Sequence, residues 1–387
     1  MRDRVTLGSL CYPASSQINL ADETMIDYID ISSVNNASKC ITGYQSFPFS
    51  ESPSRARKSV RKNSIIISTV RPNLNAVALF EIETPNVPVV STGFCVLDCK
   101  QDVDIRFVFN FCKSKSFVDQ MVTQATGASY PAVSDKIIRS AILPSYSYEE
   151  QYLIGNTLES ISCIINSRKK QLQQLDDLIK ARFVEMFGDP EINSLGWPEA
   201  NIGDNCFVTK LAGFEYTNYI HYKDNGDVVM VKAQNVKNGV LNDKELSYIT
   251  KDVSDSLPRS QLAPGDIVMT YVGANIGDVA IIDDKHFYHL APNVAKIRPA
   301  GTVYNPVFFM YMLMMKTNYI MRNSADTAKA ALGMERIRKL NVFVPNLDIQ
   351  NDFASFVAQV DKSKSVVQKA LDEAQLLFDS LMQQYFG

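Results

Sequence analysis

Apolar residues recur in steps of four and three in two long segments of the chain. The stripe falls on Ile154, Leu158, Ile161, Ile165, Leu172, Leu175 and Ile179 in the first segment, and on Phe353, Val357, Val360, Val367, Leu371, Phe378 and Leu381 in the second. This spacing, sustained over four heptads, is typical of a coiled-coil seam, and an ordinary core helix is about half as long. The pattern predicts two helices, and roughly 36 residues in each would span ~54 Å.

The two helical segments are copies of each other at an offset of 199 residues. Gln151 aligns with Gln350, Leu172 with Leu371, and Phe187-Gly188 with Phe386-Gly387, without a gap. A repeat of this length indicates two domains rather than a solenoid. If a pseudo-twofold axis relates the halves, the helices form an antiparallel coiled coil with one module at each end.

Outside the helices, short apolar runs alternate with turn residues, which is the pattern of strands. Strands are predicted over 25–31, 64–70, 76–82 and 87–97, followed by a helix over 105–121. The same order returns as strands over 228–231, 266–272, 279–282 and 291–297, and a helix from 306 to about 321. We therefore predict an α+β protein with an internal pseudo-twofold repeat: mixed α/β modules at 1–148 and 189–347, and long helices at 149–188 and 348–387.

Composition narrows the class of protein. Apolar residues make up 46% of the chain, yet no run of about 18 of them could span a bilayer, and the N-terminus has no signal-peptide h-region. We expect a cytoplasmic protein with no membrane contact. Seven scattered cysteines form no Cys-x-x-Cys pair and are interpreted as reduced. His286 and His289, three apart in a predicted strand, point to opposite faces, so we expect no metal site.

The net charge of -3 does not by itself favour a nucleic-acid partner. The positions of the charged residues along the chain are more informative than the net charge. One basic cluster comprises Arg55, Arg57, Lys58, Arg61 and Lys62, and a second comprises Arg336, Arg338 and Lys339. Each cluster alone is equally consistent with a solvated face of the protein.

Several motifs along the chain are distinctive in the order in which they occur. They include Gly265-Asp266-Ile267-Val268 with Asn275-Ile276-Gly277, the strand-proline-helix junctions 142–151 and 343–350, and the segment 183–190 followed by Gly196-Trp197-Pro198. In this order the chain resembles the specificity subunits of type I restriction-modification systems, over nearly all of its length. The first half departs from the pattern, with Lys62-Asn63-Ser64 in place of Pro264-Gly265-Asp266 and without a Trp-Pro lead.

The resemblance implies a non-catalytic subunit that reads a bipartite, asymmetric target in double-stranded DNA. It also implies two methyltransferase subunits as partners, which use S-adenosylmethionine, and restriction/translocase subunits, which use ATP and Mg; this chain itself would bind no cofactor. Arg and Lys suit phosphate contacts, and Arg, Lys and Asn suit base edges. The DNA-binding candidates are the two basic clusters and Arg71, Asn73 and Asn275 in the duplicated loop. Turn asparagines that bond their own backbone are the alternative for Asn73 and Asn275.

An enzymatic function has little support in the sequence. Asn305-Pro306-Val307-Phe308 resembles the Asn-Pro-Pro-Tyr/Phe motif of amino-methyltransferases, but it lacks the second proline and a preceding Gly-rich loop. It is better explained as a helix start with Asn305 as the cap. The segment 273–277 is not followed by Gly-Lys-Ser/Thr, so it is no P-loop. Two alternatives stay open: a coiled-coil adaptor that binds proteins, and the same DNA reader in a methylation-only or other phage-defence system.

Overall fold

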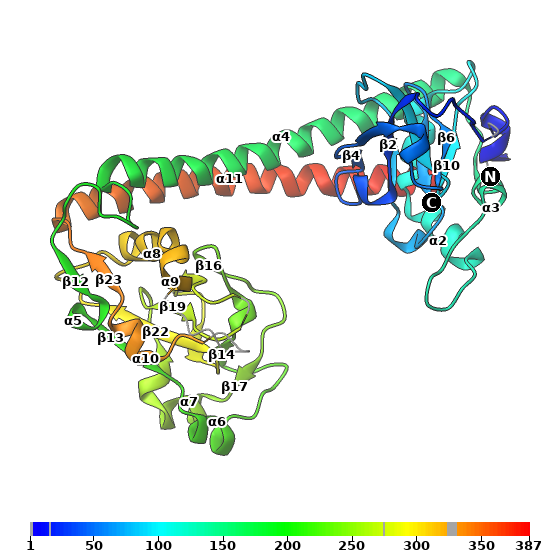
Figure 1. Ribbon diagram of the computed structural model, residues 1–387. Coiled ribbons are helices and arrows are strands. Elements are labelled where there is room, and N and C mark those ends of the chain that lie inside the picture. The colour runs from blue at the N-terminus through cyan, green and yellow to red at the C-terminus, as the bar shows by residue number, and fades with distance from the viewer. Residues whose placement is uncertain (1–2, 15–16, 274, 323–330) are drawn as a thin grey trace. The chain divides into compact units, whose positions relative to one another are not determined.

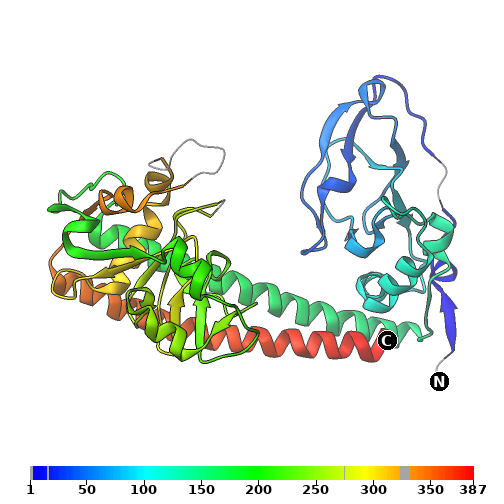
Figure 2. The same ribbon diagram turned by 90° about the horizontal axis from the view of Figure 1, so that it is seen from below.

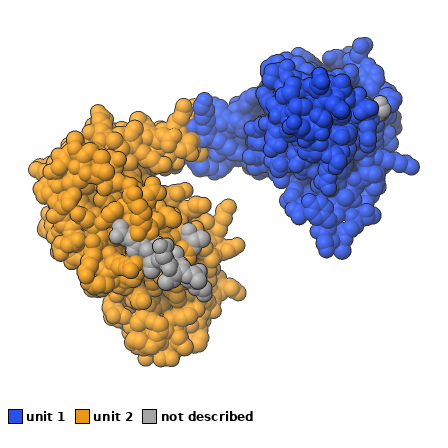
Figure 3. Space-filling model, in the orientation of Figure 1, with its two compact units in different colours: residues 1–170, 368–387 blue, residues 171–367 orange. Residues whose placement is uncertain are grey.

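The computed structural model describes residues 3–14, 17–273, 275–322 and 331–387 (Figure 1). The chain divides into two compact units, residues 1–170 with 368–387 and residues 171–367 (Figure 3). Each unit combines one mixed α/β module with a segment of both long helices.

Two sheets form the module of the first unit. The first sheet has the antiparallel order β10-β7-β8 (Phe94–Leu97, Ile65–Ser68, Val77–Leu79). The second has the order β5-β2-β9-β6 (Gln45–Pro48, Met25–Ile29, Val87–Ser91, Ala56–Ser59), in which β2 and β9 are parallel and the other neighbours antiparallel. Two further pairs are β3 with β4 (Val34–Asn35, Cys40–Ile41) and β1 with β11 (Arg4–Thr6, Ile142–Pro144).

The period of two along β7 sets the layers of this unit. Ile65 and Ile67 pack into a core with the helices, whereas Ile66 belongs to a core shared with strands of the second sheet. Successive side chains of a strand point to opposite faces, so β7 lies between two apolar layers. This explains why its run of three isoleucines has no polar residue.

Three short helices and four 3-10 turns complete the first module: α1 (Ile105–Lys113), α2 (Lys115–Gln124), α3 (Asp135–Arg139), η1 (Leu7–Leu10), η2 (Ile31–Ser33), η3 (Phe49–Glu51) and η4 (Pro72–Leu74). The single helix predicted over 105–121 is wrong. Ser114 ends α1 in an extended conformation, and its side chain accepts a hydrogen bond from the backbone N–H of Phe117. Capping by this serine starts a second helix where the periodicity alone suggested continuity.

The second unit repeats this arrangement, except that one of its two larger sheets has four strands instead of three. One sheet is β13-β22-β19-β20 (Cys206–Lys210, Val294–Pro299, Ile267–Thr270, Val279–Ile281), and the other is β17-β14-β21-β18 (Tyr248–Ile249, Val228–Val231, Phe287–Leu290, Gln261–Leu262) with β14 parallel to β21. The pairs β15 with β16 (Val236–Lys237, Val240–Leu241) and β12 with β23 (Glu199–Asn201, Asn341–Phe343) complete it. Ile267 and Met269 face the helices, and Val268 faces the other sheet.

The helices and turns of this unit are α5 (Ile202–Asn205), α6 (Gly213–Tyr219), α7 (Lys251–Ser256), α8 (Pro306–Met315), α9 (Thr317–Arg322), α10 (Met334–Arg338), η5 (Ala233–Asn235) and η6 (Pro258–Ser260). Asn305 caps α8 as predicted, because its side chain accepts hydrogen bonds from the N–H groups of Val307 and Phe308. The predicted helix over 306–321 breaks at Lys316, whose Nζ donates to the carbonyl of Pro190 at 2.6 Å.

Two further predictions of strands need correction. The run 87–97 is not one strand: β9 ends at Ser91, a turn follows, and β10 belongs to the other sheet. The strand predicted over 291–297 starts later, at Val294, and it is preceded by β21, which the pattern missed. The three residues Ser91-Thr92-Gly93 include a glycine and mark the turn between β9 and β10 in the sequence, but the prediction treated the apolar residues on both sides as one strand.

The long helices are α4 (Tyr148–Phe187) and α11 (Leu347–Phe386), and they pack together within each unit. In the first unit, Ile154 and Leu158 of α4 share a core with Phe386 of α11, and the start of the chain lies in this same unit (Figure 2). In the second, Phe353 of α11 lies edge-on to Phe183 and Phe187 of α4. The start of each helix thus lies beside the end of the other. Among the described helices, none is long and apolar enough to cross a membrane.

Every residue predicted for the seam is buried or half-buried. The buried ones are Ile154, Leu158, Ile161, Ile165, Ile179, Phe353, Val357, Val360 and Leu371, and the half-buried ones are Leu172, Leu175, Val367, Phe378 and Leu381. The middle of the stripe also carries charge, because Lys364 forms a 2.7 Å ion pair with Asp176.

Candidate functional site

The first basic cluster lies on β6 and the turn that follows it, and two of its members are already occupied within the protein. Lys58 points inward, where its Nζ donates to the carbonyl of Phe94 at 2.6 Å and pairs with Asp135 at 2.7 Å. Arg57 lies over the Phe49 ring and donates to the carbonyl of Ala56 at 2.8 Å. These contacts give Lys58 and Arg57 structural roles in addition to any contact with a ligand.

The other members of this cluster are exposed. The Arg61 side chain is 64% exposed and pairs with Asp98 at 3.1 Å, and the Lys62 side chain is 72% exposed and pairs with Glu83 at 3.2 Å. Arg55 is exposed at the entrance to β6. Pairs between exposed side chains contribute little to stability, so Arg61 and Lys62 can exchange their carboxylate partners for phosphates.

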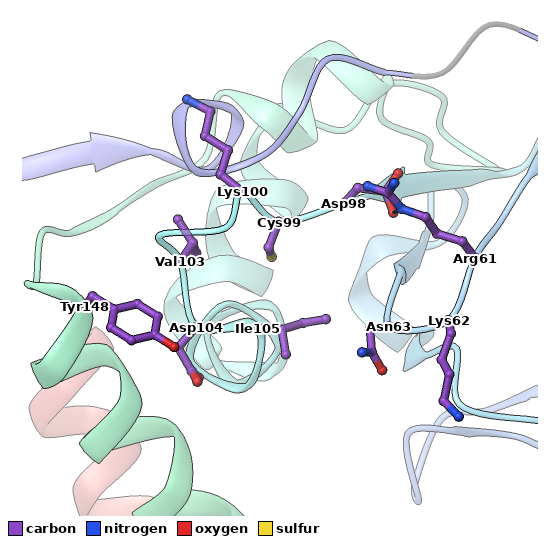
Figure 4. Close-up of a pocket in the computed structure, with 10 residues that line it drawn as sticks. All are labelled: Arg61, Lys62, Asn63, Asp98, Cys99, Lys100, Val103, Asp104, Ile105 and Tyr148. Carbon is purple, nitrogen blue, oxygen red and sulfur yellow. Dashed lines mark ion pairs between the residues drawn. The ribbon is translucent and has the colours of Figure 1, made fainter.

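Arg61 and Lys62 also border a cavity of about 320 Å³ (Figure 4). Its walls include Asn63, Cys99 and Lys100, and Tyr148 contributes from the first turn of α4. Three cations against the carboxylates of Asp98 and Asp104 give the opening a small positive balance. A hollow of this size admits small anions or oxidants rather than a base pair.

The duplicated loop does not join the basic cluster through any contact seen here among the described residues. Arg71 has a positive φ of 49°, its guanidinium lies 4.6 Å from the Tyr130 ring, and its N–H donates to the carbonyl of Pro131. Asn73 is exposed in η4, and Asn275 is exposed in the equivalent loop of the second unit. The Asn275 carbonyl accepts from the N–H of Asp278, as expected of a turn residue.

The second basic cluster lies on and just after α10. Arg338 donates to the carbonyl of Val208 at 2.9 Å, which fastens α10 to β13. Lys339 is exposed and lies 3.7 Å from Glu335. Arg336 is exposed on the same short helix. Arg338 is therefore a structural residue, and Arg336 and Lys339 present charge to solvent.

Sequence reasoning missed an aromatic surface in the second unit. Exposed rings on and after α6 belong to Phe214, Tyr216, Tyr219 and Tyr222. Glu215, on the same helix, pairs with Arg259 at 3.2 Å, and Lys210 lies over the Tyr271 ring. Aromatic and cationic side chains together are common where a protein binds another molecule. The signal was present as four aromatic residues within 214–222, a polar stretch that predicts no buried element.

The long helices present a second kind of surface. Large apolar side chains outside the seam stay exposed on both helices, and they include Tyr152, Leu153, Ile164, Leu178, Val366, Leu376 and Leu377. Leu376 is 72% exposed and Val366 71%. Contiguous exposed apolar surface on a helix is a feature of sites that bind another protein.

The chemistry of the described residues does not suggest a catalytic or metal centre. Within the described ranges, no three His, Cys, Asp or Glu side chains gather as a metal site. His289 is buried in β21, and burial lowers its pKa. Its Nδ1 lies 3.0 Å from the carbonyl of Leu290.

Comparison with known proteins gives one family. Residues 196–375 match the model described as type I restriction modification DNA specificity domain. The chain is 22% identical over 320 residues to the specificity subunit of the type I restriction enzyme EcoBI of Escherichia coli, covering 75% of this chain and 66% of that protein. The match thus spans slightly less than two thirds of the relative's length.

Two solved structures have the same fold. A chain from a study of complex assembly and conformational transition of the type I R-M system matches with a TM-score of 0.61 and 21% identity, covering 99% of this chain and 97% of that chain. The S subunit of the type I restriction-modification system of M. genitalium matches with a TM-score of 0.58 and 14% identity, covering 100% and 96%. At these identities the likeness concerns the fold alone.

Proposed function

We propose that this chain is a specificity subunit of a type I restriction-modification system, and that it reads DNA for a complex whose other subunits carry out the chemistry. The chain itself is non-catalytic, binds no cofactor and works in the cytoplasm. It reads a bipartite, asymmetric double-stranded target, with one half-site for each module.

One observation carries this proposal: the equivalent strands of the two units have the same order, but the two units expose different side chains. The first presents Arg55, Arg61 and Lys62, and the second presents the aromatic residues of α6 with Lys339. Two modules that bound the same DNA sequence would need the same exposed side chains. Two frameworks with different surfaces fit a target whose half-sites differ in sequence.

The helices α4 and α11 act as the spacer between the half-sites. Burial of the seam residues and the antiparallel run within each unit support one antiparallel coiled coil related by a pseudo-twofold axis. A rod of fixed length allows the two modules to bind one duplex only at a fixed separation.

The same helices dock two methyltransferase subunits, which use S-adenosylmethionine. Exposed leucine and valine side chains such as Leu376 and Val366 support this assignment, because solvent-facing helix positions are normally polar. Restriction/translocase subunits that use ATP and Mg join through the methyltransferase subunits.

Methylome sequencing tests the reading of DNA. In cells with the intact gene, one bipartite adenine motif is expected to be methylated, and deletion of the gene is expected to abolish that motif alone. Loss of no motif, or of a single continuous motif, would contradict the proposal.

A paired deletion tests the spacer. Removing one heptad from the middle of each helix, residues 167–173 and 367–373, preserves the four-three pattern and shortens each helix by about 10 Å. The preferred spacing between half-sites is expected to decrease by about three base pairs, while the half-sites stay the same. Unchanged spacing would show that the helices do not set it.

Affinity purification tests the docking surface and separates a DNA reader from a protein adaptor. The native chain is expected to recover a methyltransferase subunit with or without nuclease, together with specific DNA only without it. Leu376→Glu with Val366→Glu is expected to lose the methyltransferase subunit, whereas Gln359→Glu on the same helix is expected to retain it. Recovery of partners without any specific DNA would favour the adaptor.

A further inference from the structure

Cys11 and Cys99 lie opposite each other across a bridge between two distant segments of the first unit. They form an isolated antiparallel pair, between the segment that follows η1 and the residues that follow β10. Cys11 is buried, at 3% exposure, and Cys99 is half-buried. The two residues are 88 positions apart in sequence and adjacent in space.

The hydrogen bonds around this pair identify its register. The N–H of Tyr12 donates to the carbonyl of Asp98 at 2.8 Å, and the N–H of Lys100 donates to the carbonyl of Leu10 at 3.0 Å. Both bonds belong to the flanking residues, so the two cysteines form a non-hydrogen-bonded pair. In such a pair the Cα atoms are about 4.5 Å apart and the side chains lie on the same face. That distance lies inside the ~4.4–6.8 Å range that a disulfide bridges.

The surroundings favour one thiolate in this pair. Contact with the Cys99 thiol lowers the pKa of Cys11, with help from the positive charge of Arg139. Arg139 is held beside the pair, because it donates to the carbonyls of Tyr12 and Val96. Contact with Cys11 and burial raise the pKa of Cys99, so Cys11 is the cysteine of this pair that loses its proton more readily.

The other cysteines of this core are less reactive. Burial raises the pKa of Cys95 to about 12 and that of Cys112 well above its usual value. A small oxidant also has a route to the pair, because Cys99 lines the cavity of about 320 Å³ beside Lys100 and Arg61 (Figure 4). The pair therefore combines an accessible sulfur, that of Cys99, with a sulfur whose pKa is lowered, that of Cys11.

We propose that Cys11 and Cys99 are a redox-sensitive dithiol that closes to a disulfide when the cell meets peroxide. The bond fastens the N-terminal segment, residues 7–12, to the end of β10. In the reduced protein, two backbone hydrogen bonds and the side chain of Arg139 connect these two segments, and the disulfide would add a covalent link between them. The inference does not depend on the function proposed above.

The chemistry needs hydrogen peroxide as the oxidant and no other reactant. One thiolate attacks a peroxide oxygen, the O–O bond breaks, and a sulfenic acid forms with release of water after proton transfer. The second thiol then attacks the sulfenic sulfur, and a second water leaves. Two thiols lose two electrons and two protons in total, and the peroxide is reduced to two molecules of water.

Peptide mapping of the full chain under non-reducing conditions tests the proposal. After mild treatment with hydrogen peroxide, a peptide that joins Cys11 to Cys99 is expected to appear before any other linkage and to disappear with dithiothreitol. The linkage closes a long loop, so the melting temperature of the oxidised protein is expected to rise by about 5–10 °C.

Matched variants give the controls. Cys99→Ser is expected to remove both the linked peptide and the thermal shift, while Cys163→Ser, which alters an exposed cysteine on α4, retains both. If Cys99→Ser does not fold, the native peptide map decides alone. Recovery of Cys11 and Cys99 as unlinked, singly oxidised residues would overturn the proposal, as would a dominant linkage through Cys40 or Cys163.

Discussion

In both units, a glutamine in the first turn of a long helix connects that helix to the α/β module by hydrogen bonds. Gln151 accepts a hydrogen bond from the N–H of Asp104 at the start of α1, and Gln350 accepts one from the N–H of Asn305 at the start of α8. Each glutamine also donates to the carbonyl that precedes its helix, at Tyr146 or Pro345. Both glutamines are buried. This joint needs the same side-chain atoms in both halves, which accounts for the glutamine at the equivalent positions 151 and 350.

Beside that joint the two units differ. In the first, Lys113 at the end of α1 lies against the rings of Phe109 and Phe378, at 4.6 and 5.9 Å. In the second, the equivalent end of α8 carries Met314, which borders a cavity of about 740 Å³. The same joint is therefore compatible with two different neighbours, a largely buried cation in the first unit and an open groove in the second, because the glutamine hydrogen bonds are present in both.

The largest expected effect comes from the aromatic core of the second unit. Phe353→Ala removes a ring that contacts Phe183, Phe187 and Tyr311, so a loss of about 3–5 kcal/mol in unfolding free energy is expected. Hydrogen exchange should locate the loss mainly in residues 171–367. The matched change in the first unit, Ile154→Ala, should affect residues 1–170 instead. Equal loss of protection in both units after either change would contradict the division.

Replacing Gln151 or Gln350 tests the hydrogen bonds that connect each long helix to its module. Gln350→Leu leaves the N–H of Asn305 and the carbonyls of Pro345 and Val303 without their partner, and a loss of about 2–3 kcal/mol is expected. Gln151→Leu is expected to lose a similar amount. Denaturant unfolding measures both, with Gln173→Leu on the exposed face of α4 as a near-neutral control. Strongly unequal losses would show that the two joints are not equivalent.

The buried cation of the first unit gives a pH-dependent prediction. Burial lowers the pKa of Lys113 from 10.5 to about 8. Between about pH 8 and 10.5 the unfolded chain holds a proton that the folded chain has released, so this group makes stability rise with pH across that window. Below about pH 8 both states are protonated, and the full cost of burying the charge remains.

Lys113→Met, which copies the second unit, should therefore stabilise the protein at pH 7 by about 1–2 kcal/mol. The gain should fade as the pH rises toward 10. Denaturant unfolding of both proteins across this range measures the difference. A variant less stable than the native chain at pH 7 would show that contact with the two rings outweighs the cost of the charge.

The smallest effect is expected at the exposed cations. Arg61→Gln with Lys62→Gln should weaken binding to every duplex by about threefold to tenfold and reduce the salt dependence, because these side chains suit phosphate contacts. Lys115→Gln, which removes an exposed cation from α2, is the control. If the control has the same effect, the cluster is no more than a solvated face.

Much of the framework could be predicted from the sequence because its signals are local or periodic. The seam positions from Ile154 to Leu381 follow from residue spacing, and the Asn305 cap follows from one side chain. Both features can be identified from the sequence alone. The break at Ser114 was not legible, because an apolar helix pattern continues across it. The turn after Ser91 has a local signal in Thr92 and Gly93, but the prediction gave more weight to the apolar residues on both sides of it.

The candidate site was harder to predict, because exposure depends on distant partners. Lys58 and Arg338 look like the other basic residues in sequence, yet one finds Asp135 and the other the carbonyl of Val208. These partners lie far away in the sequence, so only the structure shows which basic side chains already have a contact within the protein. The rings of α6 were overlooked because exposed aromatic side chains do not produce a periodic pattern.

The position of Phe386 bears on how the protein is made. It is buried among Phe107 and Phe111, and residues 368–387 belong to the first unit. A ribosome that has delivered residues 1–367 has supplied every residue of the second unit but not all of the first. The module synthesised earliest is thus completed last, so its nascent apolar surface needs protection until the last helix emerges.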